Sequence, residues 1–218
     1  MKKLVIFDCD GTLVDSEVIA SKVYPQYWAT HGVFFSEDEF KEKFIGTGHD
    51  AEIVKETFSR MPDFAKAEGE RLLDQALAKE LTAVDGIKEI LLKLAVEKCV
   101  ASNSSLSYVK QALNKTELSH HFGDKVFSAE QVENPKPAAD LFLHACSTLG
   151  FETKNTFVVE DSPSGVRAAQ NASIKVIGFS GAGHFTSSLE ARLEATNPDY
   201  FCRSVLELEN LLVELIKL

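Results

Sequence analysis

The chain has few cysteines, and none stands in a metal-binding or redox pattern. Its 218 residues include four, spread along the sequence without a CxxC pair or a Cys/His cluster: Cys9, Cys99, Cys146 and Cys202. Zinc sites and thioredoxin-like centres need such spacings, so neither is expected. Their positions in apolar segments favour buried free thiols in a reducing compartment.

Long apolar runs are also missing. No stretch approaches the roughly 18 consecutive apolar residues of a membrane-spanning helix. Four apolar residues follow Met-Lys-Lys, but Asp8 ends this run far short of a signal-peptide core. We therefore expect a soluble, cytoplasmic protein without a membrane partner.

Positive charge is scarce. The chain has 23 Lys and Arg against 33 Asp and Glu, which gives a formal net charge of −10. This excess of acid argues against nucleic acid as the main partner. It does not exclude a small anionic substrate, because a local cation can override the overall field. The apolar content of 44% is that of a globular protein with a core.

Short apolar runs alternate with helical patterns along most of the chain. We expect strands at Leu4–Phe7, Cys99–Ala101, Lys125–Phe127, Thr156–Val159, Lys175–Phe179 and Tyr200–Cys202. These runs lack strict polar alternation, as is typical of strands buried on both faces. Strand–helix alternation predicts an α/β fold with a doubly wound parallel sheet, which binds ligands at the carboxyl ends of its strands.

One interval is too long for a single crossover helix. More than eighty residues separate Asp15 from the strand near Cys99. Apolar residues at three- and four-residue spacing predict helices over 18–28, 37–44, 51–58 and 64–79. We therefore expect an α/β core domain of residues 1–14 and 81–218, with a helical cap domain of residues 15–80 inserted into it. Asp85 is expected to N-cap the next core helix.

The first predicted strand runs into the acidic segment "DCDG". Because alternate strand residues project to one side, we expect Asp8 and Asp10 to share a face at the strand's carboxyl end. Gly11 lets the backbone turn and approach a ligand closely. Two carboxylates this close repel, so a cation, a shared proton or both should accompany them. Mg²⁺ suits such an oxygen-only ligand set.

Three further segments follow other apolar runs. Ser102 and Asn103 are neutral hydrogen-bonding residues, Lys136 lies between two prolines, and Glu160 and Asp161 are adjacent acids. In a parallel sheet these segments converge on one edge. Together with the first acidic pair they suit a Mg²⁺-bound phosphoryl group.

The segments "DCDGTLVDSE", "SNS", "NPKP" and "EDSPSG", in this order, resemble the four motifs of the haloacid dehalogenase (HAD) superfamily. The opening resembles its phosphatase and phosphomutase branch, in which a helical cap follows the first motif. Within that branch the chain looks most like sugar-phosphate phosphatases, including 6-phosphogluconate phosphatases, and β-phosphoglucomutases. The resemblance implies a HAD-like, Rossmann-type core and a Mg²⁺ cofactor.

The resemblance also implies roles for individual residues. Asp8 would attack phosphorus and form an aspartyl-phosphate, and Asp10 would protonate the leaving oxygen and then activate water. The implied metal ligands are Asp8, Asp10 through its backbone carbonyl, Glu160 and Asp161. The implied phosphate-binding residues are Gly11, Ser102, Asn103 and Lys136.

Residues near the predicted cap are candidates for substrate contact. Asp15 and Ser16 stand where the chain leaves the core, and either a hinge or a substrate contact fits them. Thr47 and His49 lie in "GTGH", which resembles the cap loop that reaches the active site in this family; a helix N-terminus is the structural alternative.

Other residues next to the motifs have structural interpretations. Ser104 and Ser105 are expected to cap a helix. Ser162 and Gly165 are interpreted as a helix start and a close-packing point. The segment 181–185, "GAGHF", is expected to be a flexible loop.

The sequence thus predicts a Mg²⁺-dependent phosphatase of a small phosphorylated metabolite, a sugar or sugar-acid phosphate. A β-phosphoglucomutase-like phosphomutase is the alternative, weakened by Ala20, which stands where mutases of this branch carry a cap histidine. A phospho-accepting signalling receiver is a third alternative of another class, and it is disfavoured because a receiver needs neither Asp10 nor a long helical insert. We expect a monomer.

Overall fold

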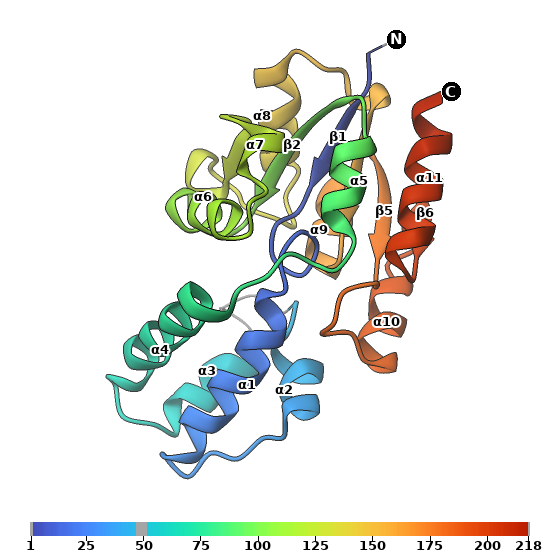
Figure 1. Cartoon of the computed structure of the whole chain (residues 1–218). Coiled ribbons are helices and arrows are strands. Elements are labelled where there is room, and N and C mark those ends of the chain that lie inside the picture. Colours follow the sequence, from blue (N-terminus) through green and yellow to red (C-terminus); the bar gives the residue numbers. More distant parts are fainter. Residues whose placement is uncertain (1, 47–51, 218) are drawn as a thin grey trace.

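Six parallel strands form the centre of the molecule in the computed structural model, which describes residues 2–46 and 52–217 (Figure 1). The spatial order is β3-β2-β1-β4-β5-β6. The bounds are β1 Leu4–Phe7, β2 Glu97–Ser102, β3 Val126–Ser128, β4 Thr156–Glu160, β5 Lys175–Phe179 and β6 Tyr200–Cys202. Each predicted apolar run overlaps one of these strands, which confirms the doubly wound parallel sheet.

The first strand is the central element of this sheet. Phe7 is in register with Val100 of β2 on one side and with Val159 of β4 on the other. The segments that follow β1, β2 and β4 therefore emerge side by side at one edge. This order has its switch point at β1, where such sheets place their ligands.

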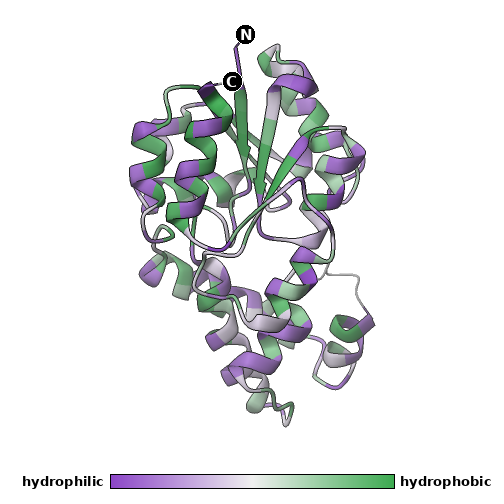
Figure 2. Cartoon of the chain, turned by 90° about the vertical axis from the view of Figure 1, so that its right-hand side faces the viewer, coloured by the Kyte–Doolittle hydropathy of each residue, from purple (hydrophilic) through white to green (hydrophobic). Residues whose placement is uncertain are grey.

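Helices cover both faces of the sheet. One face packs against α5 (Ile87–Lys93), α6 (Leu106–Lys115), α7 (Ser119–Phe122) and α11 (Val205–Lys217), and the other against α8 (Asp140–Leu149), α9 (Pro163–Asn171) and α10 (Ser187–Glu194). Figure 2 shows the apolar strands between helices whose outer sides are hydrophilic. In β1, Val5 and Phe7 belong to the first layer and Leu4 and Ile6 to the second, so both faces are buried. Short 3₁₀ turns, Ala129–Gln131 and Thr153–Asn155, precede α8 and β4.

Four helices lie between β1 and α5. They are α1 (Ser16–Ala29), α2 (Glu37–Phe44), α3 (Glu52–Ser59) and α4 (Ala65–Glu80), and α1 packs against α4. Their bounds agree with the predicted helices within two residues at each described end. A helical region inserted into the core is thereby confirmed, whereas its division into domains at residues 15 and 80 stays a prediction.

An aromatic cluster holds the inserted helices together. The Trp28 ring lies 5.5 Å from Phe40, 5.0 Å from Phe44 and 5.7 Å from Phe58, between ring centroids. Trp28 itself is 2% exposed. Aromatic pairs at such distances contribute about 0.5–1.5 kcal/mol each beyond their buried area. These helices therefore have a hydrophobic core of their own.

The two chain segments that join the helical insert to the core run beside each other. The Asp15 N–H donates to the Thr82 carbonyl at 3.1 Å, and the Val84 N–H donates to the Leu13 carbonyl at 3.0 Å. A further connection comes from α10, where the Arg192 guanidinium donates to the carbonyls of Glu42 and Ile45. The insert is thus tied to the core at its root and at α2.

The structure corrects one capping prediction and confirms another. Asp85 does not cap α5, because Gly86 takes the N-cap position in a left-handed conformation with φ of 80°. Ser105 does cap α6 and accepts from the Tyr108 N–H at 3.3 Å. Ser104 is not a cap; its hydroxyl bonds elsewhere, as described below.

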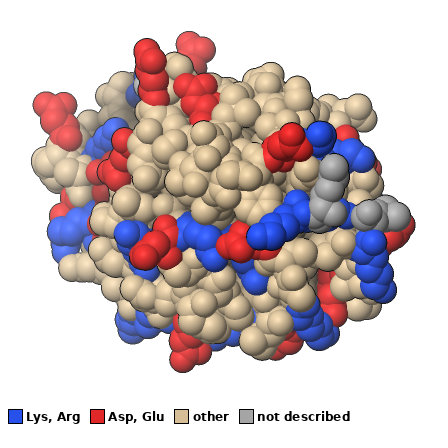
Figure 3. Space-filling model, turned by 90° about the horizontal axis from the view of Figure 1, so that it is seen from above, with Lys and Arg blue, Asp and Glu red and all other residues tan. Residues whose placement is uncertain are grey.

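Neither the distribution of surface charge nor the hydropathy of the helices indicates a particular partner. At the end of the molecule remote from the inserted helices, acidic and basic side chains are interspersed (Figure 3). Within residues 2–46 and 52–217, no helix combines the length and the apolar content needed to cross a membrane.

Candidate active site

A cavity of about 770 Å³ lies at the carboxyl edge of the sheet, between the core and the inserted helices. Its core wall includes Asp8, Asp10 and Asp161, and its other wall is formed by side chains of α1, α2, α3 and α4. Side chains from the four sequence motifs therefore meet in one place, as the parallel sheet predicts.

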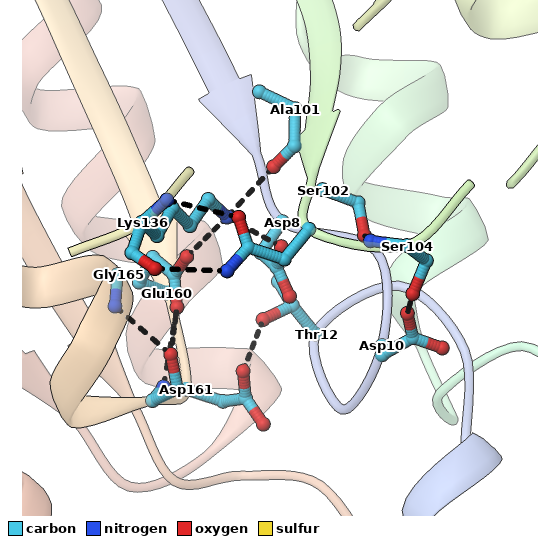
Figure 4. A network of polar contacts seen from close by, with 12 residues as sticks. Asp8, Asp10, Thr12, Ala101, Ser102, Ser104, Lys136, Glu160, Asp161 and Gly165 are labelled. Carbon is cyan, nitrogen blue, oxygen red and sulfur yellow. Dashed lines mark hydrogen bonds and ion pairs between the residues drawn. The ribbon is translucent and has the colours of Figure 1, made fainter. Parts of the chain in front are cut away.

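Three buried carboxylates and one lysine cluster at this edge of the sheet, and Asp8, Asp161 and Lys136 line the cavity. Oxygen atoms of Asp8, Glu160 and Asp161 lie within 4.8 Å of one another. The Lys136 ammonium donates to Asp8 Oδ1 at 2.6 Å, to Glu160 Oε1 at 2.5 Å and to the Ala101 carbonyl at 2.8 Å (Figure 4). Lys136 is 5% exposed, so a fully buried cation bridges two acids.

The cluster holds more negative charge than Lys136 can offset. Burial raises the pKa of Asp8 well above its ordinary value; Lys136 opposes this, and Glu160 and Asp161 add to it. Burial and Glu160 likewise raise the pKa of Asp161. Burial alone would lower the pKa of Lys136, but the carboxylates of Asp8 and Glu160 outweigh it, so that pKa is raised.

These residues fit a divalent cation. Their donor atoms are carboxylate oxygens alone, which hard cations such as Mg²⁺ prefer, and a cation would offset the repulsion that raises the carboxyl pKa values. Asp8 and Asp161 line the cavity. They are therefore placed where such an ion could be held next to a ligand.

Glu160 is held from several sides. Besides Lys136, its carboxylate accepts from the Ser162 N–H at 3.2 Å and the Ser162 hydroxyl at 2.9 Å. Ser162 also N-caps α9, and a side chain at Gly165 would collide with Glu160. The helix-start and close-packing interpretations of Ser162 and Gly165 agree with this geometry. Glu160 thereby fixes the position of Lys136.

The Asp10 carboxylate lies apart from the cluster. Oδ1 accepts from the Ser16 and Tyr108 hydroxyls and Oδ2 from the Ser104 hydroxyl, each at 2.7 Å. Asp8 and Asp10 line the same cavity, but of these two carboxylates Lys136 contacts only that of Asp8. The extended pattern continues past β1, because the Asp8 N–H donates to the Val159 carbonyl and Cys9 packs in the same layer as Phe7; the chain turns only after Cys9.

The turn depends on Gly11. Its φ is 71°, and a side chain there would collide with Asp161. Its N–H donates to the Val14 carbonyl at 2.9 Å. Gly11 thus permits the turn to approach Asp161 closely and uses its own N–H within the turn, so its contact with phosphate stays a prediction.

The last residue of β2 and the residue after it contribute in an unexpected way. The Asn103 amide donates to the Lys136 carbonyl and accepts from the Lys136 N–H, each at 3.0 Å. The buried Ser102 hydroxyl accepts from the Ser104 N–H at 3.0 Å. Both residues line the cavity, but in this structure the Asn103 side chain holds the backbone of Lys136.

The predicted substrate residues of the cap are only partly placed. Asp15 is half-buried, and its Oδ1 accepts from the Gly183 N–H at 3.4 Å. Burial raises its pKa. Thr47 and His49 lie outside the described residues.

The sequence assigns no role to three residues of the cavity, although Glu17 ends the first motif segment. Tyr108 lies one turn into α6, Glu17 in the first turn of α1, and His184 in the loop before α10. Burial raises the pKa of Glu17 to about 7. A helix-start position for the first two and an isolated histidine after a strand are weak signals, which explains why sequence reasoning did not single them out.

Comparison with known proteins agrees with this geometry. The family model for haloacid dehalogenase-like hydrolases matches residues 5–179. A 6-phosphogluconate phosphatase from Escherichia coli is 30% identical over 83% of this chain and 83% of its own length. A phosphorylated carbohydrates phosphatase from Thermotoga maritima is 27% identical over 88% of this chain and 90% of its own.

Solved structures give the same result. A conserved haloacid dehalogenase-like protein of unknown function from Agrobacterium tumefaciens superposes with a TM-score of 0.90 at 32% identity, covering 98% of this chain and 99% of that one. A HAD family hydrolase from Deinococcus radiodurans, with bound phosphate and sodium, gives 0.84 at 26% identity, covering 98% and 96%. The chain belongs to the haloacid dehalogenase-like hydrolases.

Proposed function

We propose that the protein is a Mg²⁺-dependent phosphatase of a small phosphorylated metabolite, of the sugar or sugar-acid class. The observation that carries this is the buried Asp8, held by Lys136 beside Asp161 at the floor of a cavity. The relatives that act on 6-phosphogluconate and phosphorylated carbohydrates support the substrate class. The related hydrolase with bound phosphate supports a phosphate site in this fold.

The residues divide the reaction between them. An Asp8 oxygen attacks phosphorus, and the bond from phosphorus to the leaving oxygen breaks while Asp10 donates a proton to that oxygen. Asp10 then takes a proton from water, which attacks the aspartyl-phosphate and releases inorganic phosphate and free Asp8. Lys136 keeps Asp8 in place and offsets charge on the phosphoryl oxygens.

Asp8, Asp161 and the backbone carbonyl of Asp10 would hold Mg²⁺, with Glu160 contributing directly or through water. Bound there, Mg²⁺ supplies positive charge for the phosphoryl oxygens and lowers the repulsion between the acids. The remaining work is positioning, which this class of reaction chiefly requires. The buried Ala20 on the cavity wall offers no acid–base group, in keeping with a phosphatase.

The Asp8→Asn variant tests the proposal. Asparagine is no nucleophile, so Mg²⁺-dependent hydrolysis of p-nitrophenyl phosphate should fall by at least about a thousandfold. The unfolding temperature should stay near that of the wild type, because burial already disfavours the Asp8 charge.

Asp38→Asn is the matched control. The Asp38 side chain is 77% exposed, and the activity of the variant should stay within about twofold of wild type. Retained hydrolysis in Asp8→Asn would refute the assignment. A panel of sugar phosphates, sugar-acid phosphates and nucleotides then identifies the class.

A further inference from the structure

The loop between β5 and α10 brings a buried histidine to the candidate metal site. This loop, residues 180–186, extends toward the start of α1 (Figure 1), where the Gly183 N–H donates to Asp15. His184 is 1% exposed and lines the cavity. The segment expected to be a flexible loop thus carries an internal side chain.

His184 and Thr12 contact different oxygens of the same carboxylate. His184 Nε2 lies 3.3 Å from Asp161 Oδ2, and the Thr12 hydroxyl donates to Asp161 Oδ1 at 3.3 Å. A side chain at Gly11 would strike both the Asp161 carboxylate and His184 Cε1. The Asp161 carboxylate is therefore confined by the Gly11 turn, Thr12 and the His184 ring.

The chemistry of the imidazole suits this contact. A carboxylate that binds Mg²⁺ is ionised and only accepts hydrogen bonds, so the nitrogen facing it should carry the proton. Nε2 is the ring nitrogen that faces Asp161 Oδ2, so a neutral ring would carry its proton there. Nδ1 has no hydrogen-bond partner among the described residues, so no second contact competes for the orientation of the ring.

We propose that His184 is a positioning residue, whose Nε2–H orients the Asp161 carboxylate for Mg²⁺. This rests on the proposed function, in which Asp161 is a metal ligand. Groups that orient metal ligands typically account for a 10- to 100-fold difference in metal affinity. His184 touches neither the nucleophile nor, by this assignment, the reacting phosphoryl group.

Calorimetric titration of Mg²⁺ into the substrate-free protein tests the proposal. His184→Leu removes the donor and should raise the Mg²⁺ dissociation constant about 10- to 100-fold. His184→Gln places an amide nitrogen near the position of Nε2 and should stay within about threefold of wild type. His184→Asn places its amide near the position of Nδ1 and should behave like His184→Leu.

If His184→Leu does not fold, the comparison of His184→Gln with His184→Asn still decides the test. These two variants differ by one methylene, and thus mainly in where the amide donor lies. Ser180→Ala is the loop control. It removes the bond from the Ser180 hydroxyl to Glu190 without touching Asp161, and should leave the Mg²⁺ affinity within about twofold.

The outcomes separate the two proposals. Wild-type affinity in His184→Leu and His184→Asn would overturn the role of His184 and leave the proposed function standing. The role of His184 would also be overturned if His184→Gln or Ser180→Ala bound Mg²⁺ as weakly as His184→Leu. A wild-type protein that binds no Mg²⁺ would overturn both.

Discussion

At the scale of single residues, the chemical types at the strand ends were predictable, but their partners were not. The order of Asp8, Lys136 and Asp161 along the chain, combined with a parallel sheet, places them together. Which side chain contacts which depends on turns outside the strands. The Asp10 carboxylate accepts hydrogen bonds from Tyr108 and two serines. The Asn103 side chain is hydrogen-bonded to the backbone of Lys136. Strand alternation predicts neither contact.

Asn103 provides a prediction at this scale. Asn103→Ala removes both hydrogen bonds to the Lys136 backbone, so the ammonium should lose its fixed position beside Asp8. Misplacement of a catalytic group by about 1 Å costs up to about a hundredfold, and we expect kcat/KM to fall about 10- to 100-fold in steady-state hydrolysis. Asn103→Asp keeps the acceptor for the Lys136 N–H and should lose less. Equal losses in the two variants would argue that Asn103 binds the substrate instead.

At the scale of elements, burial on both faces made the strands easy to predict. Leu4–Phe7, Lys175–Phe179 and Tyr200–Cys202 are strands with the predicted bounds. The inserted helices followed from apolar spacing, and α2 has its predicted bounds because Ser36 and Glu39 form a capping box at its start. The loop that carries His184 shows neither the apolar run of a buried strand nor the apolar spacing of a helix. Its inward direction is fixed by contacts with Asp15 and Asp161, which are distant in sequence.

The aromatic cluster of the insert leads to a prediction at this scale. Phe40 is 4% exposed and packs on Tyr24, Trp28 and Phe44. Phe40→Ala should destabilise the inserted helices by about 3–5 kcal/mol. Trp28 is the single tryptophan of the chain, so its fluorescence reports on these helices during urea unfolding.

The expected result is a Trp28 transition at lower urea that separates from the far-UV signal dominated by the core. Phe34→Ala is the control, because Phe34 in the same region is 75% exposed and its loss should cost no more than about 0.5 kcal/mol. A Phe40→Ala protein in which both signals still move together would show that insert and core unfold as one unit.

At the scale of the whole molecule, the buried acids link stability to pH and metal. In the metal-free protein the pKa values of Asp8 and Asp161 are raised well above those of unfolded carboxyls. The folded state therefore keeps protons that the unfolded chain has lost, and the free energy of unfolding falls as the pH rises toward the folded pKa values. Glu17, with a pKa of about 7, has the same sign below pH 7. His184 has the opposite sign, but above its ordinary pKa of about 6.5 it is neutral in both states.

With EDTA present, the unfolding temperature should consequently fall between pH 6.5 and pH 8. Each retained proton changes the free energy of unfolding by about 1.4 kcal/mol per pH unit. For a chain of this size, each kcal/mol shifts the unfolding temperature by about 2–4 °C.

Mg²⁺ needs deprotonated ligands, so the stabilisation by Mg²⁺ should grow over the same pH range. At a concentration 100 times its dissociation constant it adds about 2.7 kcal/mol. Calorimetric scans with Mg²⁺, and with NaCl at matched ionic strength, measure both effects, and Asp8→Asn should weaken them together. A Mg²⁺ stabilisation that shrinks with rising pH, or that NaCl reproduces, would contradict a metal held by these buried carboxylates.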